Sequence, residues 1–207
     1  VRLAEYWRTH FAEPLGLDDL LGRIHAEQLL VLDVVGQGRA RGRLELAGGA
    51  PQTSLPKFRR FGGYTAFSEG WALYAESLGQ ALGMYTDPYQ YFGRLEGELW
   101  RAIRLVVDTG LHSKGWTREQ VLEYMDANSS AAEARRVSET ERYMAIPGQA
   151  LAYKIGQLKL SELRARAEKE LGPKFDVRKF HTAVLMDGAL PLDVLEAKVD
   201  RWIASQR

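Results

Sequence analysis

Apolar residues recur with a helical period from Phe67 to Gly79, the stretch that we expect to form the centre of the fold. The apolar stripe of this stretch consists of Trp71, Tyr74, Ala75, Leu78 and Leu82. Glu69 and Glu76 are seven residues apart, so they point in nearly the same direction on a helix of about 3.6 residues per turn. Since a carboxylate beside an apolar stripe is costly to bury alone, we expect Glu69 to meet a cation, a metal ion or a proton.

Start and stop signals divide most of the chain into further helices. Asp87 with Pro88, Thr117 with Gln120, and Asp176 have the chemistry of helix starts. The expected helices cover residues 3–12, 17–33, 65–83 with Thr65 or Ser68 as the cap, 88–111, 117–127, Ser130 or Ser138 to Pro147, 149–171, 176–186 and 191–205. Residues 34–56 are expected to be irregular, with at most a short strand at residues 44–47. The predicted fold class is all-α, a multi-helix single domain.

The composition excludes several classes of function. The 207 residues include 28 basic and 27 acidic ones, a net charge of +1, so no global field recruits nucleic acid or an anionic membrane. The absence of cysteine excludes disulfides, thiolate metal sites and cysteine nucleophiles, so any metal would need His, Asp or Glu. Charged residues near Val1 and the lack of a long apolar run predict a soluble chain without a signal peptide, in a compartment that the sequence leaves open.

A row of polar residues follows one face of the expected helix over residues 88–111 and its continuation. The residues of this row are Arg101, Arg104, Asp108 and His112. The row is either a solvated stripe, with Asp108 and His112 as a pair one turn apart, or the wall of a polar cleft, which we favour because the helix is otherwise apolar. In a cleft, the two arginines could bind a substrate carboxylate and His112 could donate to a developing oxyanion.

A third polar set follows the Pro147–Gly148 interruption. Gln149, Tyr153 and Gln157 share a helical face at steps of four, with Lys154 beside them. Tyr153 either packs with a wet hydroxyl group or supplies a phenol that stabilises transition-state charge. His10, His25 and His181 are interpreted as surface or capping histidines.

From about Leu55 to the C-terminus the chain resembles the domain-of-unknown-function family 885, bacterial proteins similar to gluzincin-like zinc metallopeptidases. The stretches that carry the resemblance are residues 55–64, 67–79, 86–89, 100–116 and 147–157. The resemblance implies an all-helical domain over residues 55–207, with a divergent region over residues 1–54. It also implies peptide or amide hydrolysis, with Glu69 as a zinc ligand and with His112, Tyr153 and the arginines lining a substrate cleft.

Family members carry a His-Glu-x-x-Pro-Gly-His motif shortly before the segment that corresponds to Leu55–Tyr64. Here that place is taken by Gly36–Arg43, which contains no histidine and no carboxylate. Catalytic zinc takes three protein ligands and a water, so Glu69 alone is insufficient. The Gly36–Arg43 segment also lacks the lysine of a phosphate-binding loop and is interpreted as a mobile basic loop.

Three explanations of this departure remain open. In the first, the chain is a truncated or metal-site-defective relative that keeps the cleft as a binding or scaffold module. In the second, the motif region is a sequence artefact. In the third, a different activity uses the remaining Glu69, Asp108, His112 and Tyr153, for example a metal-free acid/base hydrolase built from Glu69 and His112. We expect a peptide or a small amide or ester as the substrate, and no nucleic-acid or membrane partner. An arginine such as Arg101 or Arg104 would neutralise Glu69 if no metal does. Missing N-terminal helices would leave apolar surface that a homodimer could bury.

Overall fold

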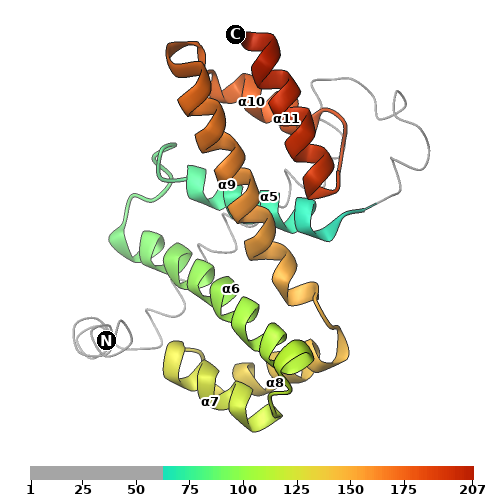
Figure 1. Cartoon of the computed structure of the whole chain (residues 1–207). Helices are drawn as coiled ribbons and strands as arrows, with labels where there is room; N and C mark the ends of the chain where they lie inside the picture. Colours follow the sequence, from blue (N-terminus) through green and yellow to red (C-terminus); the bar gives the residue numbers. More distant parts are fainter. Residues whose placement is uncertain (1–62) are drawn as a thin grey trace. The chain divides into compact units, whose positions relative to one another are not determined.

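The computed structural model describes residues 63–207, and the regular structure in this part of the chain is entirely helical (Figure 1). The prediction of an all-α fold is therefore confirmed. The chain forms two compact units, whose described parts are residues 79–151 for the first and residues 63–78 with 152–207 for the second. Within residues 63–207, no helix is long and apolar enough to cross a membrane. The elements expected before residue 63, and the domain boundary at residue 54, lie outside the described residues.

The first unit is built on the long helix α6. Its elements are α6 (Pro88–Lys114), α7 (Arg118–Asn128), α8 (Glu133–Ala145) and the 3-10 turn η3 (Gln149–Leu151). The capping box of Thr117 and Gln120 forms as predicted, and Asp87 caps α6. The apolar faces of α6, α7 and α8 enclose a core that comprises Trp100, Ile103, Val107, Val121, Met125, Tyr143 and Ala150.

The second unit is built on the packing of α5 against α9. Its elements are α5 (Thr65–Leu78), α9 (Ala152–Leu171), the 3-10 turn η4 (Gly172–Lys174), α10 (Val177–Leu185) and α11 (Leu192–Gln206). Asp176 caps α10 as predicted. The core includes Phe67, Tyr74, Leu160, Leu163, Ala167, Phe180, Val184, Leu195, Val199 and Ile203.

The predicted end of α5 and the predicted start of α8 are wrong. Helix α5 ends at Leu78 rather than near Gly83, because the chain turns there and the Met84 amide donates to the Gly79 carbonyl. Leu82 consequently lies outside the helix and is 72% exposed. Helix α8 starts after Ala132 without a side-chain cap, rather than at Ser130 or Ser138, and the Ser130 hydroxyl instead donates to the Glu96 carboxylate.

Candidate functional site

Two glycines allow α5 and α9 to touch through their backbones (Figure 1). A Cβ atom on Gly70 would lie 2.4 Å from the backbone of Gly156, and one on Gly156 would lie 1.9 Å from the carbonyl oxygen of Ala66. No residue with a side chain fits at such a contact. Because Glu69 precedes Gly70 and Tyr153 lies one turn before Gly156, the crossing of the helices also brings these two side chains together.

The Tyr153 hydroxyl donates to Oε1 of Glu69 over 3.0 Å, and both side chains are half-buried. Both residues are candidates from their sequence pattern, and the structure joins them although they are 84 positions apart. A carboxylate can accept a proton from water, and a phenol can donate to a developing negative charge. The pair therefore has the chemistry of an acid/base centre.

The other residues predicted around Tyr153 are divided between the two units. The Lys154 ammonium group donates to Oε1 of Gln157 over 2.7 Å, and Gln157 is buried. Gln149 does not share their helical face, because residues 149–151 form a 3-10 turn and α9 starts only at Ala152. The predicted face at steps of four therefore holds for Tyr153 and Gln157 and is wrong for Gln149.

Two residues of the α6 polar row are buried, which is contrary to the solvated-stripe interpretation for that part of the row. Arg104 is 5% exposed and Asp108 is 2% exposed. Both carboxylate oxygens of Asp108 accept from the Gly148 amide, over 3.1 and 3.2 Å. Gly148 has φ +79°, a left-handed conformation that favours glycine. Asp108 thus fixes the turn that leads into Gln149.

Gln149 joins α6 to α8 through two arginines. Its Oε1 accepts from Arg104 over 3.1 Å and from Arg142 over 3.3 Å. Arg142 also donates to Glu139 over 2.8 and 2.6 Å, and the Tyr143 hydroxyl donates to Glu139 over 2.7 Å. Burial raises the pKa of Glu139, but the Arg142 and Tyr143 hydrogen bonds outweigh it and lower that pKa to about 2. Glu139 is therefore a firmly ionised partner of the arginines.

The other two residues of the row bond to backbone carbonyls. Arg101 donates to the Gly97 carbonyl of its own helix over 2.8 Å. Nε2 of His112 lies 3.0 Å from the Tyr143 carbonyl oxygen, so this nitrogen carries the proton and donates it. His112 is exposed and belongs to the first unit, whereas Glu69 and Tyr153 belong to the second. A shared pocket of all three, and the pairing of Glu69 with Arg101 or Arg104, stay predictions.

The zinc site implied by the family resemblance does not fit the described residues. Within residues 63–207, no three His, Asp or Glu side chains are grouped so that they could hold a metal ion. Catalytic zinc needs about three such ligands. The segment Gly36–Arg43 lies outside the described residues, and its sequence has none of these residue types.

A polar cluster around Tyr74, which was not predicted from the sequence, lies among the described residues of the second unit. Nε2 of His181 lies 2.9 Å from the hydroxyl of Tyr74, and Arg164 donates to the same hydroxyl over 3.3 Å. His181 is half-buried, so its interpretation as a surface or capping histidine is wrong. A signal was available, because His181 lies three residues before the buried Val184 and so borders the apolar face of α10.

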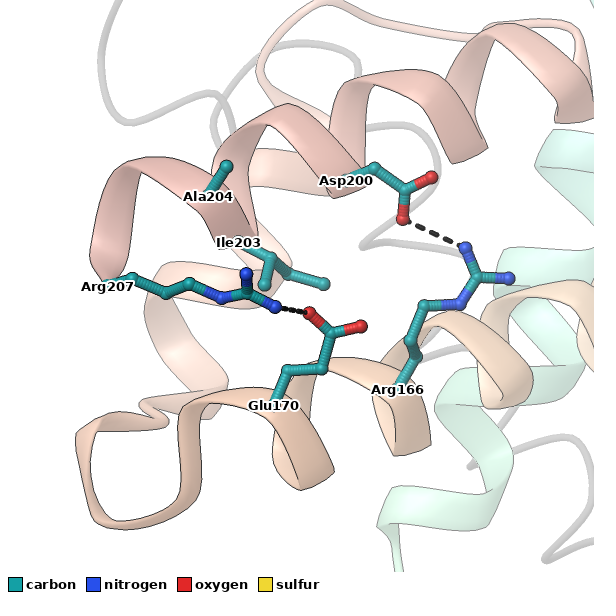
Figure 2. Close-up of a pocket in the computed structure, with 6 residues that line it drawn as sticks. All are labelled: Arg166, Glu170, Asp200, Ile203, Ala204 and Arg207. Carbon is teal, nitrogen blue, oxygen red and sulfur yellow. Dashed lines mark hydrogen bonds and ion pairs between the residues drawn. The ribbon is translucent and has the colours of Figure 1, made fainter.

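A hollow of about 280 Å³ lies between the C-terminal parts of α9 and α11 (Figure 2). Two ion pairs cross it, Arg166 with Asp200 over 2.8 Å and Arg207 with Glu170. The remaining lining residues are Ile203 and Ala204. Since the charges in this hollow neutralise one another and none of the predicted site residues lines it, Glu69 with Tyr153 remains the better candidate site.

Comparisons with known proteins identify relatives at the level of family and fold. The family model for a bacterial protein of unknown function, DUF885, matches residues 44–199. A solved candidate lipoprotein from Colwellia psychrerythraea has 53% identity and a TM-score of 0.72, and the match covers 74% of this chain and 26% of that one. A candidate lipoprotein of unknown function from Shewanella oneidensis has 22% identity and a TM-score of 0.68, with 75% and 28% covered, which is a likeness of fold alone. The chain thus spans about a quarter of the length of these solved chains. No curated protein matches.

Proposed function

The chain belongs to the DUF885 family of bacterial proteins, and we propose that it carries a site for hydrolysis of peptide or amide bonds in which Glu69 and Tyr153 are the reacting pair. The observation that carries the proposal is the hydrogen bond of 3.0 Å from the Tyr153 hydroxyl to the Glu69 carboxylate. The resemblance to gluzincin-like metallopeptidases supports a peptide as the substrate.

The reaction that we propose needs no group beyond these two side chains and water. The Glu69 carboxylate takes a proton from water while the water oxygen bonds to the carbonyl carbon of the amide. The electron pair of the carbonyl bond moves to the carbonyl oxygen, and the Tyr153 hydroxyl turns from Glu69 to donate to that oxygen. The electron pair on that oxygen then re-forms the carbonyl bond, and the carbon–nitrogen bond breaks as Glu69 passes its proton to the leaving nitrogen. The carboxylic acid and amine products leave, and the Tyr153 hydroxyl returns to the Glu69 carboxylate.

Substitution of the pair tests this proposal directly. We expect Glu69→Gln to lower the turnover of an internally quenched peptide library at least about a hundredfold, because a general base contributes about 10²- to 10⁴-fold. Tyr153→Phe should also lower turnover, with kcat affected more than KM, because the hydroxyl acts on the transition state. The exposed Glu123→Gln and Tyr64→Phe are matched controls that should retain full turnover. Turnover that survives both site substitutions would overturn the proposal.

A non-catalytic binding module is the second candidate. It is favoured because residues of the α6 polar row make structural hydrogen bonds within the first unit. Asp108 and Arg104 bond to Gly148 and Gln149 in the segment after α8, and His112 bonds to the Tyr143 carbonyl of α8 itself, so all three have a role in holding this part of the first unit together. This candidate predicts that the chain retains the peptides of the library without cleaving them, and that the purified protein contains no stoichiometric zinc. One tightly held zinc per chain, measured by elemental analysis, would count against it.

A further inference from the structure

Three helices of the second unit meet at a buried phenol. The Tyr74 side chain of α5 is 2% exposed, and its hydroxyl lies 2.9 Å from Nε2 of His181 on α10. Arg164 of α9 donates to the same hydroxyl over 3.3 Å. The Nε atom of Arg164 also donates to Glu168 over 2.8 Å, and this second bond holds the guanidinium group beside Tyr74.

The donors and acceptors of this cluster fix the protonation state of His181. A guanidinium group only donates, so the phenol oxygen accepts from Arg164. Because the phenol is buried, its proton needs an acceptor, and among the described residues Nε2 of His181 lies within reach. Nε2 can accept only in the neutral imidazole with its proton on Nδ1. Protonation of His181 would turn Nε2 into a donor, and the buried phenol proton would lose this acceptor.

The surroundings of His181 oppose its protonation as well. Its ring packs edge-on against Trp71 of α5 at a centroid distance of 5.3 Å, and Phe180 of its own helix lies at 5.8 Å. Burial in this aromatic setting, followed by the positive charge of Arg164, lowers the pKa of His181 below its ordinary 6.5. Among residues 63–207, the titratable groups at His181 are Tyr74 from α5 and Arg164 from α9, and Arg164 is paired with Glu168. Helix α11 contributes the uncharged Trp202, which packs on Phe180.

We propose that Tyr74, Arg164 and His181 form a latch that holds α10 against α5 while His181 is neutral and releases α10 when His181 is protonated. Because the imidazole takes up a proton more readily when α10 is detached, the latch contributes its full stabilising free energy above pH 6.5. This stabilisation decreases as the pH falls from 6.5 to the lower pKa that His181 has while α10 is docked, and below that pKa it decreases no further. A nine-residue helix such as α10 depends on its tertiary contacts, so it is suited to be the moving part.

Hydrogen exchange measured by mass spectrometry on the whole chain tests the latch. Exchange rates divided by the intrinsic rates give the equilibrium constant for opening. For peptides within Val177–Leu185 this constant should increase by a factor approaching ten for each pH unit below 6.5, until the pKa of His181 in the docked helix is reached. Peptides within Leu192–Gln206 in the same samples are the internal control and should show no such step. An α10 exchange that is independent of pH, or that changes in step with α11, would overturn the proposal.

Two variants separate the latch from a general loosening at low pH. His181→Gln cannot be protonated, but its amide oxygen can still accept from Tyr74, so the pH step should disappear. Tyr74→Phe removes the phenol proton that needs the neutral imidazole, so the step should shrink and the pKa of His181, followed by NMR titration, should move back toward 6.5. A full step in His181→Gln would overturn the proposal, as would an unchanged His181 pKa in Tyr74→Phe. If His181→Gln does not fold, the Tyr74→Phe titration decides the matter.

Discussion

Gly156→Ala is expected to lower the free energy of unfolding by about 3 kcal/mol, the upper end of the usual range for overpacking. Alanine is the better helix former by about 1 kcal/mol, so helix propensity alone would predict stabilisation. The steric term outweighs it, because the new Cβ would lie 1.9 Å from the Ala66 carbonyl oxygen and 2.7 Å from the Cα of Gly70. Neither atom belongs to a flexible side chain, so α5 and α9 must move apart and loosen the packing around Phe67 and Leu160.

Urea denaturation of the purified chain measures this change, and Gly63→Ala is the matched control. A Cβ on Gly63 would meet nothing within 4 Å, so the control should unfold near the midpoint of the unchanged protein. Gly156→Ala should also weaken the proposed hydrolysis, because the separated helices pull Tyr153 away from Glu69. Equal midpoints for the two variants would contradict the close contact of α5 and α9.

The pairing of Glu69 with Tyr153 shows how far the sequence alone could define the site. Each residue stood out because it is polar on a helix with an apolar face, and that property is readable from periodicity. Their contact depends on a backbone-to-backbone approach at Gly70 and Gly156, 86 positions apart in the sequence. In sequence, a glycine inside a helical pattern indicates only a locally less stable helix. Nothing near Glu69 or Tyr153 therefore indicated that the two residues are partners.

Helix starts were predictable where a side chain makes the cap. Asp87, Thr117 and Asp176 each accept a backbone amide hydrogen bond at the start of their helix, a local interaction that residue type and spacing reveal. Helix α8 starts after Ala132, which has no capping group, so its start is set by packing within the first unit. Helix α5 ends at Leu78 although the apolar periodicity continues to Leu82, because the chain turns there and the Met84 amide donates to the Gly79 carbonyl.

The partners of the α6 polar row could not be found from the row itself. The need of Arg104 and Asp108 for partners was evident, because both lie in an apolar helix. The partners are the amide of Gly148 and the side chain of Gln149, in a turn about 40 residues later. Glu139 and Arg142 were not selected as candidates, since α8 is rich in charged residues and resembles a solvated helix in sequence. The many charged residues of α8 therefore gave no indication that Glu139 and Arg142 form a half-buried network.

Asp108→Ala is expected to lower the free energy of unfolding of the first unit by about 2 kcal/mol, a typical value for a hydrogen bond to a charged group. The substitution removes both oxygens that accept from the Gly148 amide, and it leaves a void at a position that is 2% exposed. The turn at Gly148 then loses its anchor on α6, and Gln149 is released from its position between Arg104 and Arg142.

The local consequence distinguishes this anchor from a general contribution to stability. Hydrogen exchange of peptides that cover residues 146–151 should accelerate in Asp108→Ala, while peptides of α7 keep their protection, because α7 has no bond to this turn among the described residues. Asp126→Ala is the matched control in the same unit. Its side chain is 68% exposed and pairs with Arg136 at the surface, where an ion pair contributes at most about 1 kcal/mol. If the turn stays protected in Asp108→Ala, or if both variants unfold at the same urea concentration, Asp108 does not hold the segment that carries Gln149.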